Sequence, residues 1–427
     1  MSYGNGVVAN ISYSPDRLQL QCLRYDTTGI DNPCTKDSSA KFMLTYAYGS
    51  SGSNNGQITG IYDSVDNGRS VAYSYDGLGR LSSAITSGSS GYPAWGLSWT
   101  YDRYGNRLTQ TVTAGSAYPD TQTYGTTYPN NGAYTNHPDG HSFDPSGNMT
   151  NDGVNTLTYD AAGKLITASV SGTGVGAYVY DGHGLRVQKC VPNCTSPTTT
   201  SVYIFAGSKV IAEYDNPSGS TPSPTREYIY SGNRLVARFT SSATNYYLRD
   251  HLSNRVITDS SGTVIEQLGH YPYGETWYDT GSEKWKFSIH ERDSESANDF
   301  AMARYIVSRL GRFSSPDLHS GRLIIPQSLN RYAYALDDPI NMVDLLGLDA
   351  EAGNCWWGGS EDGSVDDGGA DPSTCVKGGG AWCDSTGCTW DVGYLDPDTG
   401  NGPLMNGGIL QYFNYDDVAY YLKLSPV

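Results

Sequence analysis

The chain has little charge and few large apolar side chains for its length. Only 17% of its 427 residues are charged, and it holds 6 Met and 8 Phe. Acidic residues outnumber basic ones by 44 to 27, which gives a formal net charge of −17. Because phosphate contacts need clustered Lys and Arg, this balance excludes a body that binds nucleic acid directly.

The sequence also lacks any apolar run long enough to cross a bilayer. Residues 1–6 contain neither the basic region nor the apolar h-region of a signal peptide. Segments Tyr3–Gly6 and Tyr13–Arg17 look like the interior of a repeat array. We therefore expect upstream repeats that carry an export signal, and we expect no membrane span.

Tyrosine and glycine are abundant, at 35 and 51 residues, while hydrophobic residues make up 37% of the chain. Aromatic residues favour strands, and glycine favours the turns between them. Tyrosine adds a polar hydroxyl to an apolar ring. The composition predicts an all-β chain in which one face of the sheet lines a polar or solvated cavity.

One short phrase recurs in the first half of the chain: an aromatic residue, Asp, two variable residues, Gly, and a polar or long side chain. Asp at the start of a turn accepts a hydrogen bond from the backbone two residues on, and Gly three residues later supplies a positive φ. Alternating segments such as residues 71–75 and 107–112 flank these turns, as expected of strands with one buried face. Since one hairpin cannot bury its own apolar face, the repeats predict hairpins stacked in one long sheet. The five copies are Tyr75–Arg80, Tyr101–Asn106, Phe143–Asn148, Tyr159–Lys164 and Tyr180–Leu185.

These phrases resemble the YD repeats of the rearrangement-hotspot (Rhs) family, which is similar to teneurins and to the C subunits of insecticidal toxin complexes. The second half of the chain resembles the Rhs repeat-associated core. The resemblance implies a long spiralling sheet of repeated β-hairpins, wound into a hollow shell. The phrases of the second half that carry it are Tyr246–Val256, Tyr271–Glu275, Glu291–Asp293, Ala303–Tyr305, Leu310–Phe313, Ser315–Asp317, Pro326–Tyr334 and Asp338–Asn341.

Three regions follow from this interpretation. Residues 1–245 form the YD-repeat strip, and residues 246–348 form the repeat-associated core. Residues 349–427 are a small irregular region with 13 Asp or Glu against two Lys, and with no Arg or His. Because most toxin chemistries of this family need His, Arg or a zinc site, we expect a disulfide-stapled module or a partly disordered tail here.

The resemblance also implies a self-cleaving aspartyl protease at the end of the core, which frees the C-terminal region. Asp317 and Arg304 match its Ser-Pro-Asp and Ala-Arg phrases, and the expected cut falls between Leu348 and Asp349. Two carboxyl groups suit this work, because an ionised one activates water while a protonated one polarises the scissile carbonyl. We expect Asp344 to be the second carboxyl group.

Two residues depart from the family pattern. The residue after the matching Arg is a catalytic Asp in toxin-complex C subunits, but it is Tyr305 here. Leu345 stands where the family phrase before the cut, Asp-Pro-x-Gly-Leu, has a Pro that would hold the backbone extended. We therefore expect this chain to be a non-enzymatic shell. The alternative function is that of an autoproteolytic toxin precursor.

The eight cysteines fall into local groups. Closely spaced pairs predict disulfides formed in an oxidising environment, with three possible pairings among the last four. Those four lack a Cys-x-x-Cys pair and an accompanying His, so we expect no metal, and no motif requires a cofactor. The candidates are Cys22 with Cys34, Cys190 with Cys194, and Cys355, Cys375, Cys383 and Cys388.

Together these features favour a secreted or cell-surface β-shell of an Rhs-type polymorphic toxin system used in bacterial competition. Its cargo would be its own C-terminal region, which it would enclose or present. A delivery apparatus and an immunity protein are further expected partners. A third alternative is an extracellular carbohydrate-binding or adhesive surface, since exposed Tyr and Trp rings can stack on sugars.

Overall fold

Strands dominate the computed structural model of this chain. It describes residues 1–27, 33–50, 52–115, 121–124, 136–216, 222–319, 321, 323 and 325–348, and the backbone of residues 129–130, 133–134, 351–352, 381–384 and 387–390. The helical segments among them are 3-10 turns of three or four residues. Within these ranges no helix is long and apolar enough to cross a membrane. The all-β fold predicted from the sequence is confirmed.

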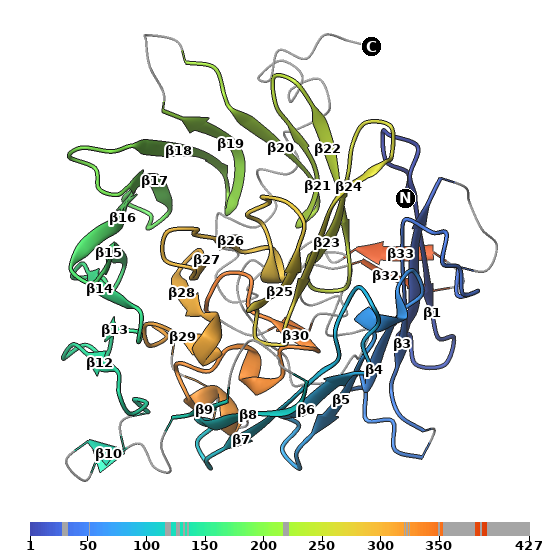
Figure 1. Ribbon diagram of the computed structural model, residues 1–427, viewed down its shortest axis with the longest axis horizontal. Coiled ribbons are helices and arrows are strands. Elements are labelled where there is room, and N and C mark those ends of the chain that lie inside the picture. Colours follow the sequence, from blue (N-terminus) through green and yellow to red (C-terminus); the bar gives the residue numbers. More distant parts are fainter. Residues whose placement is uncertain are drawn as a thin grey trace, which may run out of the picture. The chain divides into compact units, whose positions relative to one another are not determined.

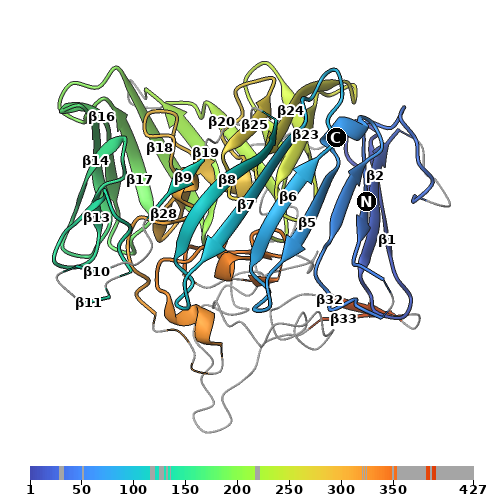
Figure 2. The same ribbon diagram turned by 60° about the horizontal axis from the view of Figure 1, so that its bottom comes forward.

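Two antiparallel sheets form a wall in which each strand pairs with the next one along the chain. Figure 2 shows these strands standing side by side. The first sheet contains β1 (Val8–Tyr13), β2 (Leu20–Asp26), β3 (Phe42–Ala47), β4 (Gly60–Asp63), β5 (Val71–Tyr75), β6 (Leu81–Thr86), β7 (Trp95–Tyr101), β8 (Arg107–Gly115) and β9 (Gln122–Thr123), with the turn η1 (Asn67–Arg69). The second contains β12 (Ser142–Phe143), β13 (Met149–Asn151), β14 (Asn155–Tyr159), β15 (Leu165–Val170), β16 (Thr173–Tyr180), β17 (Arg186–Val191), β18 (Thr199–Ala206), β19 (Lys209–Asp215), β20 (Arg226–Ser231), β21 (Arg234–Phe239), β22 (Thr244–Arg249), β23 (Asn254–Thr258), β24 (Val264–His270) and β25 (Thr276–Asp279).

Shorter strands make up the rest of the described chain. Between the two wall sheets lies the pair β10 (Pro129–Asn130) and β11 (Ala133–Tyr134). A four-stranded sheet follows the wall, with β26 (Glu291–Arg292), β27 (Asp299–Ala301), β28 (Arg304–Val307) and β29 (Arg312–Phe313). Two further pairs are β30 (Met342–Val343) with β31 (Glu351–Ala352), and β32 (Ala381–Asp384) with β33 (Gly387–Trp390). The 3-10 turns of this part are η2 (Phe287–Ile289), η3 (Ser308–Leu310), η4 (Pro326–Leu329) and η5 (Ala335–Asp337).

The repeated phrase forms the same turn at each of its five positions. At Asp76 the carboxylate accepts hydrogen bonds from the amides of Leu78 and Arg80, at 2.9 and 3.0 Å. The amide of Asp76 donates to the carbonyl of Arg80, and Gly79 closes the turn with a φ of +81°. Corresponding bonds and a positive-φ glycine recur at the other four Asp residues of the phrase. The turn predicted from Asp and Gly is thus the unit from which the wall is built.

In the four copies of the phrase that open with tyrosine, the hydroxyl of that residue bonds to a backbone carbonyl that precedes it in the chain. The hydroxyl of Tyr101 donates to the carbonyl of Leu81 at 2.6 Å, and that of Tyr180 donates to Leu165 at 2.8 Å. Leu81 and Leu165 are each the first residue of the neighbouring strand, and the side chains of both are buried. A ring that fills the sheet surface and a hydroxyl that satisfies a backbone acceptor explain why Tyr is preferred to Phe here.

The wall closes on itself through side chains of its first and later strands. Asn5 donates to Asp259 at 2.8 Å, and the Tyr25 hydroxyl donates to the carbonyl of Arg249 at 2.9 Å. Arg234 donates to the Tyr3 hydroxyl at 2.6 Å. These bonds join β2 and the residues before β1 to β21, β22 and the residue after β23, and so connect the start of the wall to its later strands (Figure 1).

The wall surrounds residues 283–348. These residues form hydrogen bonds and ion pairs with strands along the length of the wall. Asn341 donates to the Tyr75 hydroxyl at 3.0 Å, and the Tyr332 hydroxyl donates to the carbonyl of Gly147 at 2.8 Å. Farther along, Arg186 of the wall pairs with Asp293 at 2.6 Å. We call residues 283–348 the plug, and Figure 1 shows its strands β26–β30 between the two wall sheets.

Ion pairs hold the plug against the wall. Glu291 contacts Arg186 at 2.8 Å and Lys189 at 3.3 Å, and Glu283 contacts Arg238 at 2.6 Å. Burial alone would raise the pKa of Glu291, but Lys284, Arg186 and Lys189 hold it well below its usual value. From the low hydrophobicity of the chain we expected the sheet to have an inner face that lines a polar or solvated cavity. In the structure, charged groups of the plug contact this inner face.

The contacts within the chain divide it into two units, residues 1–354 and 355–427. In the first unit Cys22 is bonded to Cys34, and Cys190 to Cys194, as predicted. In the second, residues 383 and 388 lie opposite each other in the β32–β33 hairpin. Cys355 and Cys375 lie outside the described residues, so the pairing of the four tail cysteines stays a prediction.

Candidate functional site

The structure brings together the three side chains that the sequence singles out. Arg304 begins β28, Asp317 follows β29 and Asp344 follows β30, so three separate segments of the plug supply the site. Nη2 of Arg304 lies 2.7 Å from Oδ2 of Asp317 and 3.4 Å from Oδ2 of Asp344. All three residues are at most 8% exposed. One guanidinium group is thus shared by two buried carboxyl groups.

The remaining donors of Arg304 bind backbone carbonyls. Its Nη1 donates to the carbonyl of Arg331 at 2.8 Å, and its Nε donates to the carbonyl of Gly347. The same Arg331 carbonyl accepts the amide of Asp317 at 2.8 Å, and the Arg331 side chain donates back to the Asp317 carbonyl. Arg304 and Arg331 together fix the backbone on which Asp317 stands.

The two carboxyl groups differ in their surroundings. Burial, only partly offset by Arg304 and by the Leu348 amide, raises the pKa of Asp344 to about 7. Burial also raises the pKa of Asp317, against the opposing charge of the closer Arg304. Because Arg304 lies closer to Asp317 than to Asp344, a single proton held by the pair favours Asp344.

The segment that contains the predicted cut is held next to this pair. The amide of Leu348 donates to Oδ1 of Asp344 at 2.9 Å, and the carbonyl of Leu346 accepts the amide of Ala303 at 3.0 Å. Beyond the predicted cut, β31 returns to pair with β30, with Met342 opposite Ala352 and Val343 opposite Glu351. Asp349 itself lies outside the described residues.

Gly347 allows this segment to approach the end of β27 and the start of β28. Its φ is +69°, and a Cβ atom placed there would lie 2.5 Å from the carbonyl oxygen of Ala301. Any larger residue would push the loop away from Arg304.

The two departures from the family pattern have different consequences. Successive side chains of a strand point to opposite faces, so Tyr305 lies away from Arg304 and bonds to Asp293 at 3.0 Å. It therefore takes no part in the carboxyl pair. At Leu345 the segment is held by the contacts of its neighbours Asp344, Leu346 and Gly347, without a Pro.

Some residues of this site could not be assigned a role from the sequence. The ring of Phe313 lies under the Arg304 guanidinium, with its centroid 3.7 Å from Cζ. Phe313 and Arg331 both belong to quoted core phrases, but a phrase alone does not show which side chains meet. Only the fold brings residues 304, 313, 331 and 344 together.

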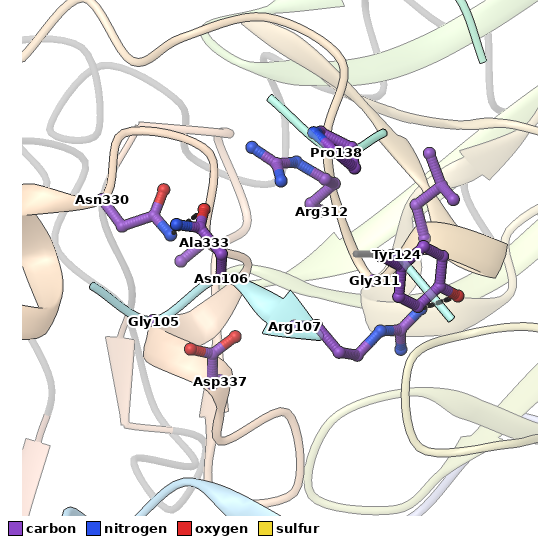
Figure 3. A pocket seen from close by; sticks show the side chains of 11 residues that line it. Gly105, Asn106, Arg107, Tyr124, Pro138, Gly311, Arg312, Asn330, Ala333 and Asp337 are labelled. Carbon is purple, nitrogen blue, oxygen red and sulfur yellow. Dashed lines mark hydrogen bonds between the residues drawn. The ribbon is translucent and has the colours of Figure 1, made fainter. Parts of the chain in front are cut away.

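A second buried carboxylate lies beside a small cavity of about 10 Å³, which has room for one water molecule. Asp337 is 3% exposed, and its Oδ2 has no hydrogen-bond partner among the residues that the structure describes. Figure 3 shows it facing Asn106 and Arg107. Burial raises the pKa of Asp337 to about 7, against the charges of nearby Arg side chains. Within the described part of the chain, no group of three or more His, Cys, Asp or Glu could hold a metal ion.

A wall of Tyr-Asp hairpins closed around a plug defines the class of this protein as a YD shell. Residues 34–340 match the family model of the teneurin YD-shell. The chain belongs to this family, which confirms the resemblance seen in the sequence.

Two curated relatives are nucleases of Bacillus. The chain is 27% identical over 259 residues to the tRNA3(Ser)-specific nuclease WapA of Bacillus spizizenii, and 26% identical over 256 residues to the tRNA nuclease WapA of Bacillus subtilis. Each match covers 58% of this chain and 11% of the relative. The chain thus spans about a tenth of the length of these curated relatives.

Solved toxin-complex structures share the fold at low sequence identity. A crystal structure of TcdB2-TccC3-Cdc42 superposes with a TM-score of 0.63 at 20% identity, covering 81% of this chain and 18% of that one. The Tc holotoxin pore of Photorhabdus luminescens gives a TM-score of 0.62 at 20% identity, with 82% and 19% covered. These likenesses establish the shell fold.

Proposed function

We propose that this chain is a structural section of a secreted toxin-type shell and that its C-terminal region, from residue 349 on, is the cargo. The observation that carries this proposal is the closed wall with its plug. The plug contains the buried Asp317, Asp344 and Arg304. Two disulfides in the wall support an oxidising, extracellular destination. The toxin-complex structures with the same fold support a place in a toxin assembly.

Cargo that is not part of the shell should be dispensable for its folding. A chain that ends at Asn354 keeps the whole first unit, including the β30–β31 pair. We expect its thermal unfolding midpoint to match that of the full chain within about 2 °C, since the shortened chain keeps every described strand of the wall and the plug. A shortened chain that fails to fold would show that the C-terminal region is part of the fold.

We further propose that the shell cuts its own chain between Leu348 and Asp349. In this reaction ionised Asp317 accepts a proton from water, and the water oxygen attacks the Leu348 carbonyl carbon. Protonated Asp344 donates its proton to the nitrogen of Asp349 as the C–N bond breaks. The products are a carboxyl group on Leu348 and an amine on Asp349, and proton transfer from Asp317 to Asp344 restores the pair. The support is the geometry, since one Arg contacts both carboxyl groups and Asp344 holds the Leu348 amide.

The proposed roles fix the pH dependence of cutting. Because Asp344 must be protonated, the rate should fall as the pH rises above about 7, and because Asp317 must be ionised, it should fall again in acid. A refolding time course followed on denaturing gels at several pH values measures this profile. Asp317→Asn and Asp344→Asn should each stop the cut, while Asp16→Asn, at an exposed residue, should leave it unchanged. Equal cutting in all four chains would exclude the carboxyl pair.

A further inference from the structure

The guanidinium group of Arg304 is bound along its edge and stacked on its face. Its edge nitrogens contact Asp317, Asp344 and the carbonyls of Arg331 and Gly347. Its face lies on Phe313, whose ring centroid is 3.7 Å from Cζ. A cation this close to the face of a desolvated ring is attracted by the ring quadrupole.

Phe313 is itself fixed by its surroundings. It is fully buried, pairs with Ile306 in the β28–β29 ladder, and packs with Phe287 and Tyr334 in one hydrophobic cluster. Its amide donates to the carbonyl of Tyr332 at 2.9 Å. The ring is therefore a rigid surface, and it defines the plane in which the Arg304 nitrogens meet their acceptors.

The position of Arg304 within this plane determines how strongly its charge stabilises each of the two carboxyl groups. Nη2 lies 0.7 Å closer to Asp317 than to Asp344, from contacts of 2.7 and 3.4 Å. Because the interaction of charges depends on their separation, a guanidinium free to leave this plane would stabilise both carboxylates less. Losing the surface beneath the Arg should therefore change the protonation of both Asp residues.

We propose that Phe313 is a positioning residue that holds Arg304 between Asp317 and Asp344 and so sets the proton distribution of the pair. This inference rests on the proposed self-cleavage for its biological meaning, but the positioning itself can be measured whether or not the chain is cut. Phe313 touches neither the scissile bond nor water in this account, and it acts only through Arg304.

The chain offers a matched control for this proposal. Phe300 is also buried in the plug, and Cζ of Arg186 lies 4.1 Å from its ring centroid. Arg186 binds Glu291 and Asp293, away from Asp317 and Asp344. Phe300→Met thus removes a similar stack in a similar core at a place where the carboxyl pair is not affected.

The test compares Phe313→Met, Phe313→Tyr and Phe300→Met with the parent chain. If the parent is cut, its rate of cutting after refolding is measured as a function of pH. The fall in this rate on the acid side of the profile, the acid limb, reports ionisation of the carboxyl pair. We expect Phe313→Met to move this limb about one pH unit higher, on the order of a tenfold change in proton affinity. Phe313→Tyr, which keeps the ring, should restore the parent profile, and Phe300→Met should leave it unchanged.

If the parent stays intact, the self-cleavage proposal fails and the same comparison is made by carbon-13 NMR titration of labelled Asp carboxyl groups. Asp317→Asn and Asp344→Asn assign the two signals. We expect the same upward change in Phe313→Met alone. Unchanged titration in Phe313→Met, or an equal change in Phe300→Met, would overturn the positioning role in either case. Circular dichroism of each variant, compared with the parent, shows that the titrated chains are folded.

Discussion

At the scale of single residues, the wall depends on groups that satisfy backbone hydrogen bonds. The tyrosine hydroxyls of the repeated phrase reach the carbonyls of neighbouring strands, and the Asp carboxylates close the turns. Both roles need one polar atom at one place. Small substitutions therefore separate the role of the polar atom from that of the surrounding side chain.

The tyrosine contact can be tested at Tyr180. Tyr180→Phe keeps the ring but leaves the carbonyl of Leu165 without its 2.8 Å donor. Because a buried acceptor without a partner is unfavourable, we expect a loss of about 1 kcal/mol in the free energy of unfolding. Guanidinium unfolding measures it, with Tyr62→Phe, at a ring that is 46% exposed, as the control. An equal loss in both variants would contradict the proposed contact.

Backbone conformation can be tested within one turn. Gly79 has a φ of +81°, whereas Gly77 of the same turn has no positive φ and open space around it. We expect Gly79→Ala to lower the free energy of unfolding by about 1 to 2 kcal/mol, since a Cβ disfavours the left-handed conformation. Gly77→Ala should be neutral or slightly stabilising. Urea unfolding of the two variants decides between turn geometry and a general effect of alanine.

Buried Asp337 predicts a specific dependence of stability on pH. Its pKa rises from 3.8 to about 7 on folding, so the folded chain keeps a proton that the unfolded chain loses. The contribution of this group is fully present below pH 4 and is lost as the pH rises to about 7. Asp337→Asn should therefore gain stability over the parent across this window, by about 4 kcal/mol at most. Unfolding curves at pH 5 and pH 8 test this, and exposed Asp16→Asn should show no such gain.

At the scale of elements, the sequence predicts local structure well. Asp and Gly at fixed spacing define the turn because the carboxylate and the positive φ act within six residues. A turn of the same form occurs at Asp259–Thr263, where the preceding residue is Thr258 and not an aromatic. The Asp and Gly spacing alone could have found it.

The two disulfides constrain elements of different size. Cys22 and Cys34 are 12 residues apart, and Cys190 and Cys194 are four apart. Since a longer closed loop removes more entropy from the unfolded chain, we expect replacement of the first pair by Ser to cost about 3 kcal/mol and of the second about 2 kcal/mol. Chemical unfolding under oxidising conditions measures both. A larger loss for the second pair would contradict the loop-length argument.

At the scale of the whole molecule, the sequence alone could not show how distant segments meet. The closure of Tyr3 and Tyr25 on Arg234 and Arg249 joins parts of the chain more than 200 residues apart. The meeting of Arg304 with Asp317 and Asp344 likewise depends on three separate segments of the plug. Their residue types were found through family phrases, whereas their distances and their shared burial follow only from the fold.

The central claim is that the plug holds its carboxyl pair against the chain in order to separate shell from cargo. Intact-mass spectrometry of the freshly folded chain tests it most directly. The account predicts two components whose masses correspond to residues 1–348 and 349–427, and one uncut component for Asp317→Asn. A parent chain that keeps its full mass at every pH between 5 and 8 would contradict it.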